Sequence, residues 1–427
     1  MSVIVPTAGQ ARALDLSRAL LAAPGHAVGV VVGYAGTGKT TLIREVGGLA
    51  GSLAVVCPTG KAAGRVREAT GLEASTIHSW LYDPSEGKGG EVSFDRRSAS
   101  KMRVPPSGLM VVDEASMVGP DVWQDLRAAA QELGLKILLV GDGFQLPPVQ
   151  APGAAPFSVL DDSFRPGGFV GRVVLDEILR QAEGSPIIRA SMELRTGDAS
   201  RALAAFPRVP ASVLAAEGAQ VFRRGGAIIC HRNVTRLAIN EAVRFALGLS
   251  GQAPEPGEPL LVTKNCRRAG LANGEGATFR GWKSTLSKPR KVSDRWKGTK
   301  EQATFGRALI EGGTDVVLSP EEVQGRLDGG AAAIAVASAA WPGAKMGKDA
   351  RGFDVVAPHL HASLGYCLTG HKSQGSQYPE VIAVSEWSVK ISEEEGRRWW
   401  YTTITRAVRQ VAICEGYRPL PVARRNA

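Results

Sequence analysis

The sequence has few cysteines, and none of them is arranged to bind a metal or to build a disulfide framework. The five are Cys57, Cys230, Cys266, Cys367 and Cys414, an odd number without any CxxC spacing. Structural zinc sites and small disulfide-rich domains need closely spaced cysteines. We therefore expect reduced thiols that lie mostly in the core.

Long apolar runs are also missing. No stretch approaches the roughly 20 apolar residues that cross a bilayer, and the first positive side chain is Arg12, so the start does not resemble a secretory signal. Apolar residues at 44% and charged residues at 22% are ordinary for a globular protein. We expect a cytoplasmic protein, of a bacterium or of a host cell if a phage encodes it, with no membrane partner.

Acidic residues are too few to balance the basic ones. The chain has 51 Lys and Arg against 41 Asp and Glu, a net charge of +10, which favours a polyanionic partner such as nucleic acid. Residues 280–300 hold eight basic side chains and one acid, together with Trp282 and Trp296. Cations that hold phosphate and rings that stack on bases suit a strand-binding surface. A solvated loop anchored by two tryptophans is the alternative.

The apolar pattern predicts an α/β fold with more than one domain, since 427 residues exceed one ordinary domain. Residues 1–150 alternate apolar strands with helical stretches, as in a parallel sheet with crossover helices. Residues 81–106 interrupt this unit as a small hairpin. A second α/β unit comprises 151–264 and 362–427, and it is split by a β-rich insert at 265–361.

Residues 33–40, GYAGTGKT, match the phosphate-binding P-loop between a strand and a helix. Gly33, Gly36 and Gly38 let the backbone approach phosphate closely. Lys39 is placed to reach the β and γ phosphates, and Thr40 to bind Mg²⁺. An ordinary glycine-rich turn explains the strand and helix context poorly.

Two further strands end in polar residues. GLMVV runs into Asp113 and Glu114, and KILLVGD is followed by Gln145. Ligands of open α/β sheets bind at the carboxyl ends of strands. We expect Asp113 to hold the metal, Glu114 to polarise the attacking water and Gln145 to sense the γ-phosphate.

The blocks GYAGTGKT, VVDEASM, GDGFQLPPV, HKSQGS and YTTITRA occur in an order that resembles superfamily 1 helicases, in the RecD-like branch that includes the bacteriophage Dda helicase. TAGQARAL, PTGKAAGRV and STIHSWL resemble smaller blocks of the same family: the Q motif, motif Ia and motif Ib. The resemblance implies two RecA-like P-loop domains: 1A, with the hairpin 1B inserted, and 2A, with the β-rich domain 2B inserted. It also implies ATP and Mg²⁺ as cofactors.

The resemblance assigns further nucleotide contacts. Gln10 would read adenine, while Arg180 and Arg406 would act as arginine fingers from the second α/β unit. The family often has a glutamate after the Gly-Ser of motif V, where this chain has Gln377, which leaves the preference for a ribonucleotide open. The remaining implied nucleotide contact is Thr41.

The resemblance also implies residues that contact the nucleic-acid strand. The implied residues are Pro58, Thr59, Lys61 and His78 on one side of a DNA groove and Thr369, His371 and Lys372 on the other. Both histidines have the alternative of a buried structural role. Phe94 is the candidate wedge at the duplex junction, with packing of the hairpin on the sheet as the competing explanation.

The function predicted from these residues is an ATP-dependent helicase on single-stranded DNA and duplex junctions, moving 5′ to 3′. Polarity comes from the resemblance alone. An RNA helicase of the viral superfamily 1 type and a partner-dependent ATPase subunit are the alternatives. We expect a monomer, with single-stranded-DNA-binding or replisome proteins as candidate partners in replication, repair or recombination.

Overall fold

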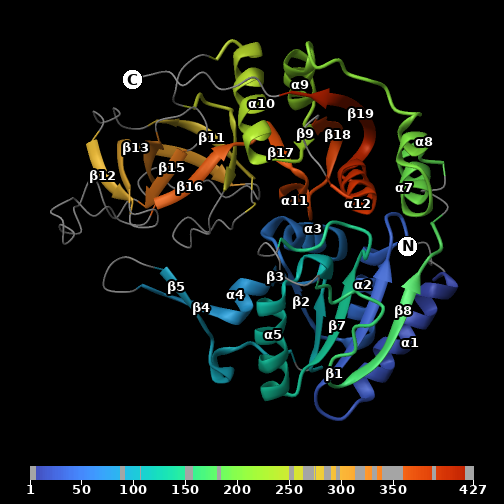
Figure 1. Ribbon diagram of the computed structural model, residues 1–427. Helices are drawn as coiled ribbons and strands as arrows, with labels where there is room; N and C mark the ends of the chain where they lie inside the picture. The colour runs from blue at the N-terminus through green and yellow to red at the C-terminus, as the bar shows by residue number, and fades with distance from the viewer. Residues whose placement is uncertain are drawn as a thin grey trace.

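The computed structural model describes residues 6–86, 92–105, 107–149, 157–179, 184–249, 254–262, 274, 276–282, 290–294, 299–312, 323–328, 334–338, 359–386 and 391–418. Within these ranges the chain forms three larger sheets and one hairpin. Figure 1 shows one α/β unit below, a second above it, and the third sheet to the side of the second. This arrangement confirms the predicted fold class.

The first unit is built on a six-stranded parallel sheet in the order β3-β2-β6-β7-β1-β8. Its strands are β1 Ala27–Gly33, β2 Ala54–Cys57, β3 Ala74–Thr76, β6 Leu109–Val112, β7 Lys136–Gly141 and β8 Phe169–Leu175. Its helices are α1 Ala8–Ala22, α2 Lys39–Ala50, α3 Gly60–Thr70, α4 Ile77–Leu81 and α5 Pro120–Leu133, with short 3₁₀ turns η1 Ala99–Lys101 and η2 Ala115–Met117.

Burial on both faces explains why β1 is an unbroken apolar run. All seven of its residues are buried, with Val28, Val30 and Val32 in the core beneath α4 and α5. Val31 points the other way, into the core beneath α1, α2 and α3. A fully buried aliphatic side chain contributes roughly 1.5–3 kcal/mol, so this strand anchors the P-loop that follows it.

Strand β8 corrects the predicted boundary at residue 150. Residues 151–264 were assigned to the second unit, yet β8 pairs in parallel with β1 as the edge of the first sheet. Leu175 is buried in the same core as Val31. The apolar pattern shows a strand here, but it does not show which sheet an edge strand joins.

Residues 81–106 contain a pair of antiparallel strands. Strands β4 Tyr82–Glu86 and β5 Val92–Arg96 pair antiparallel. The hydroxyl of Tyr82 donates to Asp125 of α5 at 2.7 Å, and Arg96 pairs with Glu132 of the same helix at 2.5 Å. The base of the hairpin is therefore tied to the first unit.

The second unit has a four-stranded parallel sheet in the order β17-β9-β18-β19. These strands are β9 Ala227–Cys230, β17 Cys367–Thr369, β18 Tyr378–Glu386 and β19 Ala407–Tyr417. Helices α7 Pro186–Thr196, α8 Ala199–Leu203 and α12 Glu393–Ile404 share a core with one face. Helices α9 Leu214–Arg223 and α10 Asn233–Ala246 cover the other, and α11 Gly370–Ser373 follows β17.

The β-rich insert is an antiparallel sheet in the order β11-β10-β16-β15-β14-β13-β12, closed on itself by a β11–β13 pairing. Its strands are β10 Pro259–Val262, β11 Gly276–Trp282, β12 Arg290–Asp294, β13 Thr299–Gly312, β14 Val323–Asp328, β15 Ile334–Ser338 and β16 His359–Leu364. The base of this sheet is joined to the second unit by a buried ion pair, Arg244 to Glu258 at 2.6 Å. Tyr366 donates to the same carboxylate at 2.8 Å.

Four of the five cysteines fall within the described residues, and each of them is a buried free thiol. This agrees with the expected reduced core cysteines. No helix in the described part of the chain is both long enough and apolar enough to cross a bilayer.

Candidate functional site

The P-loop joins β1 to α2 and has the backbone that its glycines predict. Gly36 and Gly38 have φ values of 81° and 78°, a region that side chains other than glycine adopt at a cost. A Cβ atom on Gly38 would lie 2.6 Å from Nε2 of Gln10. Lys39 donates from Nζ to the carbonyls of Gly33 and Tyr34 at 2.8 and 2.9 Å. Thr40 and Thr41 are half-buried in the first turn of α2.

Strands β6, β7 and β1 are neighbours in the sheet, so their carboxyl ends deliver three motifs to one place. Asp113 and Glu114 follow β6 and are each 2% exposed, while Gln145 follows β7 and is 4% exposed. Nε2 of Gln145 lies 3.5 Å from the Glu114 carboxylate. The two strand-end motifs found in the sequence therefore meet.

The two carboxylates have opposite electrostatic environments. Burial and the charge of Glu114 raise the pKa of Asp113 to about 6. Burial also acts to raise the pKa of Glu114, but the positive charges of Arg65, Arg406 and Lys39 outweigh it and leave this pKa below its usual value. Oδ2 of Asp113 is buried and has no hydrogen-bond partner among the described residues. An orphaned carboxylate oxygen beside a P-loop fits a hard cation such as Mg²⁺.

Arg65 is a site residue that the sequence reasoning did not single out. It lies on α3, and its Nη2 is 2.8 Å from Oε1 of Glu114. The block PTGKAAGRV pointed only to strand binding. Arg65 reaches the carboxylate because β2, which precedes α3, is the sheet neighbour of β6. That pairing joins segments too far apart for sequence spacing to reveal.

Arg406 brings the second unit to the site. It follows α12, is 4% exposed and donates to the main-chain oxygens of Thr402 at 2.9 Å and Ser376 at 3.4 Å. Burial lowers the pKa of this guanidinium, and the charge of Glu114 opposes the shift. Arg406 is therefore within electrostatic reach of the strand-end carboxylates. The other predicted arginine finger, Arg180, lies outside the described residues.

Gln10 and Gln377 differ in their surroundings. Gln10 forms a capping box with Thr7 at the start of α1 and points its amide toward the carbonyls of Thr37 and Gly38, at 3.4 and 3.5 Å. It is 3% exposed. Gln377 is exposed in the turn before β18. Gln10 thus touches the P-loop directly.

The residues predicted to contact the nucleic-acid strand lie on both units. Thr59 caps α3, and Thr369 is buried and caps α11. A Cβ on Gly375, in the turn after α11, would meet Oγ1 of Thr59 at 2.8 Å. Nζ of Lys61 lies 3.5 Å from the hydroxyl of Tyr378. The first helical turn of α3 and the motif V turn are therefore packed together across the two units.

The remaining strand candidates are half-buried or lie in the hairpin. Pro58 precedes the α3 cap. Burial lowers the pKa of His78, of His371 and of Lys372, and the charge of Arg236 contributes at Lys372. The backbone of Phe94 pairs with Pro84 in the hairpin.

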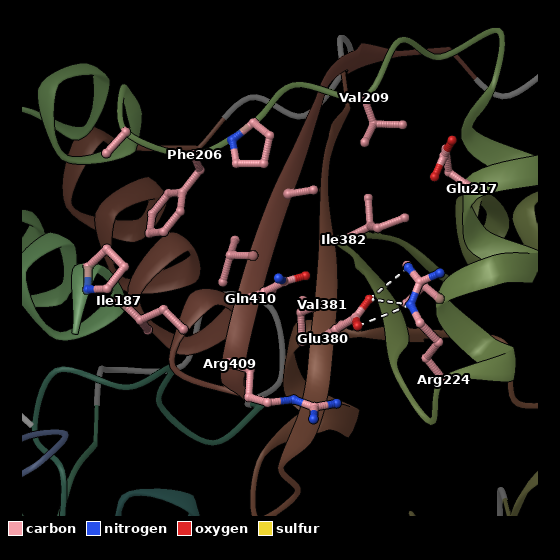
Figure 2. Close-up of a pocket in the computed structure, with 16 residues that line it drawn as sticks. Ile187, Phe206, Val209, Glu217, Arg224, Glu380, Val381, Ile382, Arg409 and Gln410 are labelled. Carbon is pink, nitrogen blue, oxygen red and sulfur yellow. Dashed lines mark hydrogen bonds and ion pairs between the residues drawn. The ribbon is translucent and has the colours of Figure 1, made fainter.

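A cavity of about 350 Å³ lies elsewhere in the second unit, between β18, β19, α7 and α9 (Figure 2). Ile187 and Phe206 line one side, and Glu380 forms an ion pair with Arg224 at 2.8 Å on the other. None of the predicted site residues lines it. It is a feature distinct from the nucleotide residues.

Comparison with known proteins agrees with this geometry. Residues 7–209 match the model of an AAA domain, which passes the predicted boundary at residue 150, and residues 364–414 match the UvrD-like helicase C-terminal domain. The ATP-dependent RecD2 DNA helicase of Deinococcus radiodurans is 31% identical over 273 residues, which are 58% of this chain and 36% of that protein. The RecBCD enzyme subunit RecD of Mycolicibacterium smegmatis is 29% identical over 417 residues, or 90% of this chain and 67% of that protein.

This chain thus spans little more than a third of the RecD2 protein that it matches. The solved structure of the Pif1 helicase from Bacteroides in complex with ADP-AlF3 and ssDNA has a TM-score of 0.56 and 17% identity, covering 96% of this chain and 92% of that one. At this identity the likeness shows a shared fold of two RecA-like domains with an added sheet domain. The chain therefore contains regions that match an AAA domain and a UvrD-like helicase C-terminal domain, and it is similar to RecD and RecD2 proteins in sequence.

Proposed function

We propose that the chain is an ATP-dependent DNA helicase that moves 5′ to 3′ on single-stranded DNA and separates duplexes. The observation that carries the proposal is the meeting of five polar groups from both units at the carboxyl ends of β6, β7 and β1. They are Lys39, Asp113, Glu114, Gln145 and Arg406. This arrangement suits phosphoryl transfer, which depends on positioning and on neutralising charge.

Within that site each group has a role fitted to its environment. Thr40 and Asp113 would hold Mg²⁺, which when bound neutralises phosphate charge. Glu114, kept ionised by Arg65, Arg406 and Lys39, orients the attacking water with help from Gln145. Arg406 approaches from the second unit, so hydrolysis depends on how the two units sit together.

Translocation follows from strand contacts on both units. The α3 cap and the motif V turn touch through Thr59 and Gly375, and Lys61 reaches Tyr378. When the units shift on nucleotide binding and release, the grip on the strand changes in step. The candidate wedge is Phe94 on the β4–β5 hairpin, which is an excursion from the first unit.

The names of the relatives bear on the two alternatives, an RNA helicase and a partner-dependent motor. The RecD2 relative is named as a DNA helicase, which favours DNA over RNA as substrate. The relative from Mycolicibacterium smegmatis is named as a subunit of the RecBCD enzyme, so a partner-dependent motor is the second candidate. We propose a monomer in the cytoplasm, with single-stranded-DNA-binding or replisome proteins as its partners.

The decisive experiment is unwinding of two partial duplexes by the purified chain with Mg²⁺ and ATP, one with a 5′ tail and one with a 3′ tail. Unwinding of only the 5′-tailed substrate is the expected result. Unwinding of only the 3′-tailed substrate contradicts the polarity. Strand-stimulated ATP hydrolysis without unwinding on either substrate supports the partner-dependent motor, and stronger stimulation by RNA than by DNA contradicts the DNA assignment.

A further inference from the structure

One buried hydroxyl of the second unit completes the hydrogen bonding of two loops of the first. Tyr401 lies on α12 and has no exposed surface. Its hydroxyl accepts from the main-chain N–H of Ala35, in the P-loop, at 2.8 Å. It donates to Oδ2 of Asp142, at the end of β7, at 2.5 Å. A single side chain therefore links the P-loop and the loop that carries Gln145.

The contact continues to Gln145 through Asp142 and Phe144. The second carboxylate oxygen of Asp142 accepts from the N–H of Phe144 at 3.1 Å. The ring of Phe144 packs edge-on against Tyr401, with centroids 5.2 Å apart and planes at 86°. The next residue is Gln145, whose amide lies against Glu114. Fixing Asp142 therefore fixes the turn from which Gln145 extends.

Other residues of the second unit also contact these two loops. Oγ1 of Thr402 accepts from the N–H of Leu146 at 2.9 Å, and Gln374 donates to the Leu146 carbonyl at 2.9 Å. The guanidinium of Arg195, on α7, lies 3.0 Å from the ring centroid of Tyr34, which precedes Ala35 in the P-loop. Tyr401 is the member of this group that touches both loops at once.

Tyr401 and Arg406 belong to the same segment, because α12 ends at Ile404 and Arg406 follows two residues later. Burial and the Asp142 carboxylate raise the pKa of the Tyr401 hydroxyl, so it remains a proton donor. Separation of the units would leave the Asp142 carboxylate and the Ala35 N–H without this partner, which costs free energy for buried groups.

We propose that Tyr401 is a positioning residue for ATP hydrolysis, whose hydroxyl holds the P-loop and the Gln145 turn in register with Arg406. This role rests on the ATPase activity proposed above. Tyr401 does not touch the reacting atoms; it acts through Ala35 and Asp142. The chain thereby couples the arrangement of the two units to the readiness of the site.

The first test is Tyr401→Phe, which keeps the ring and its packing on Phe144 and removes only the hydroxyl. We expect kcat for strand-stimulated ATP hydrolysis to fall about tenfold. The KM for ATP should change by less than about twofold, because the phosphate-binding groups remain. Tyr417→Phe is the matched control, since it removes a hydroxyl from β19 in the same unit and should leave kcat unchanged.

A double variant separates action through Asp142 from a general loss of packing. Asp142→Asn keeps an oxygen for the Phe144 N–H and removes the charged acceptor of the Tyr401 hydroxyl. If both residues belong to one contact, Tyr401→Phe combined with Asp142→Asn loses no more than about twofold beyond the worse single variant. Losses that multiply overturn the proposed route. If Tyr401→Phe fails to fold, Asp142→Asn alone provides the test, with the same expected changes in kcat and in the KM for ATP.

Amide hydrogen exchange provides a readout that does not need activity. Peptides covering residues 33–38 should exchange faster in Tyr401→Phe than in the parent chain and in Tyr417→Phe, because the Ala35 N–H loses its acceptor. Unchanged exchange together with a kcat within twofold of the parent overturns the role of Tyr401. A parent chain without ATPase activity overturns the proposed function itself, whatever the exchange shows.

Discussion

The two α/β units contain equivalent strand-to-helix turns that differ in the anion each is suited to hold. In the first unit β1 leads into α2 through the P-loop, with Lys39 at the start of the helix. In the second, β9 leads into α10 through His231 and Arg232. There the main-chain N–H groups of both residues donate to Oε1 of Glu386 at 2.9 Å, and Nε of Arg232 lies 2.5 Å from Oε2.

The second turn is thus closed by a carboxylate of the protein, where the first is built for phosphate. Glu386 is 4% exposed and ends β18, the sheet neighbour of β9. Amides at a helix N-terminus attract an anion in either case. The difference between the two turns lies in their composition. Glycines and a lysine leave the first turn open to a ligand, while the second is satisfied internally.

The largest effect that tests this comparison is expected for Lys39→Ala. It removes the cation that the P-loop presents to phosphate, so kcat for ATP hydrolysis should fall by at least about 1000-fold. Affinity for single-stranded DNA, measured by fluorescence anisotropy, should stay within about threefold, because the proposed strand contacts lie elsewhere. Lys136→Ala, at the opposite end of the sheet, is the control for loss of a lysine. Equal loss of hydrolysis and strand binding in Lys39→Ala contradicts separate sites.

An intermediate effect is expected at the second turn for Glu386→Gln. An amide at this position loses its charge and places an NH₂ group against either the turn or Arg232. Breaking one partner of a buried ion pair usually costs 3–5 kcal/mol, and the part exposure of Arg232 reduces this to about 2–3 kcal/mol of unfolding free energy. Urea denaturation followed by circular dichroism measures the loss.

The control for that change is Glu415→Gln, because Glu415 pairs with Arg208 at 2.7 Å on the surface. An exposed pair contributes less than about 1 kcal/mol, so this variant should unfold almost as the parent does. If Glu386→Gln and Glu415→Gln destabilise the protein equally, the contacts of Glu386 do not close the turn.

Features that depend on a local sequence pattern could be predicted from the sequence. GYAGTGKT predicted the P-loop between a strand and a helix, and the apolar runs before Asp113 and Gln145 predicted strands whose ends meet. The roles assigned to these residues, and the strand contacts, stay predictions. The pattern also predicted a hairpin at 81–106 and a β-rich insert at 265–361, although the sheet of the insert includes β10 and β16, which extend past both predicted bounds. In each of these cases the residues that specify the feature are close together in the chain.

Features that depend on distant pairing could not be read from the sequence. The place of β8 beside β1, the reach of Arg65 to Glu114 and the Tyr401–Asp142 bond each join segments whose contact is fixed only by tertiary packing. The second turn was missed for the same reason, since Glu386 lies 154 residues from Arg232. An alternating apolar strand has the same appearance whichever sheet it joins.

The smallest effect concerns His231, which shares the second turn. Its ring stacks on Trp399 at 3.8 Å with planes 15° apart. Burial lowers its pKa from 6.5 to about 4, although the Glu386 carboxylate opposes the shift. Between these values the unfolded chain binds the proton more readily than the folded chain, so stability falls as pH drops below 6.5. This contribution is fully present above that pH.

His231→Phe keeps an aromatic ring against Trp399 and removes the titrating group. Between pH 7 and pH 5 the parent should lose about 1 to 2 kcal/mol more unfolding free energy than the variant, after allowance for the part exposure of the ring. Urea titrations at pH 7, 6 and 5 give this difference directly. Parallel pH dependences in the two proteins would mean that His231 is protonated alike in the folded and unfolded states. The attraction of Glu386 would then offset the effect of burial, and the second turn would be less desolvated than its contacts indicate.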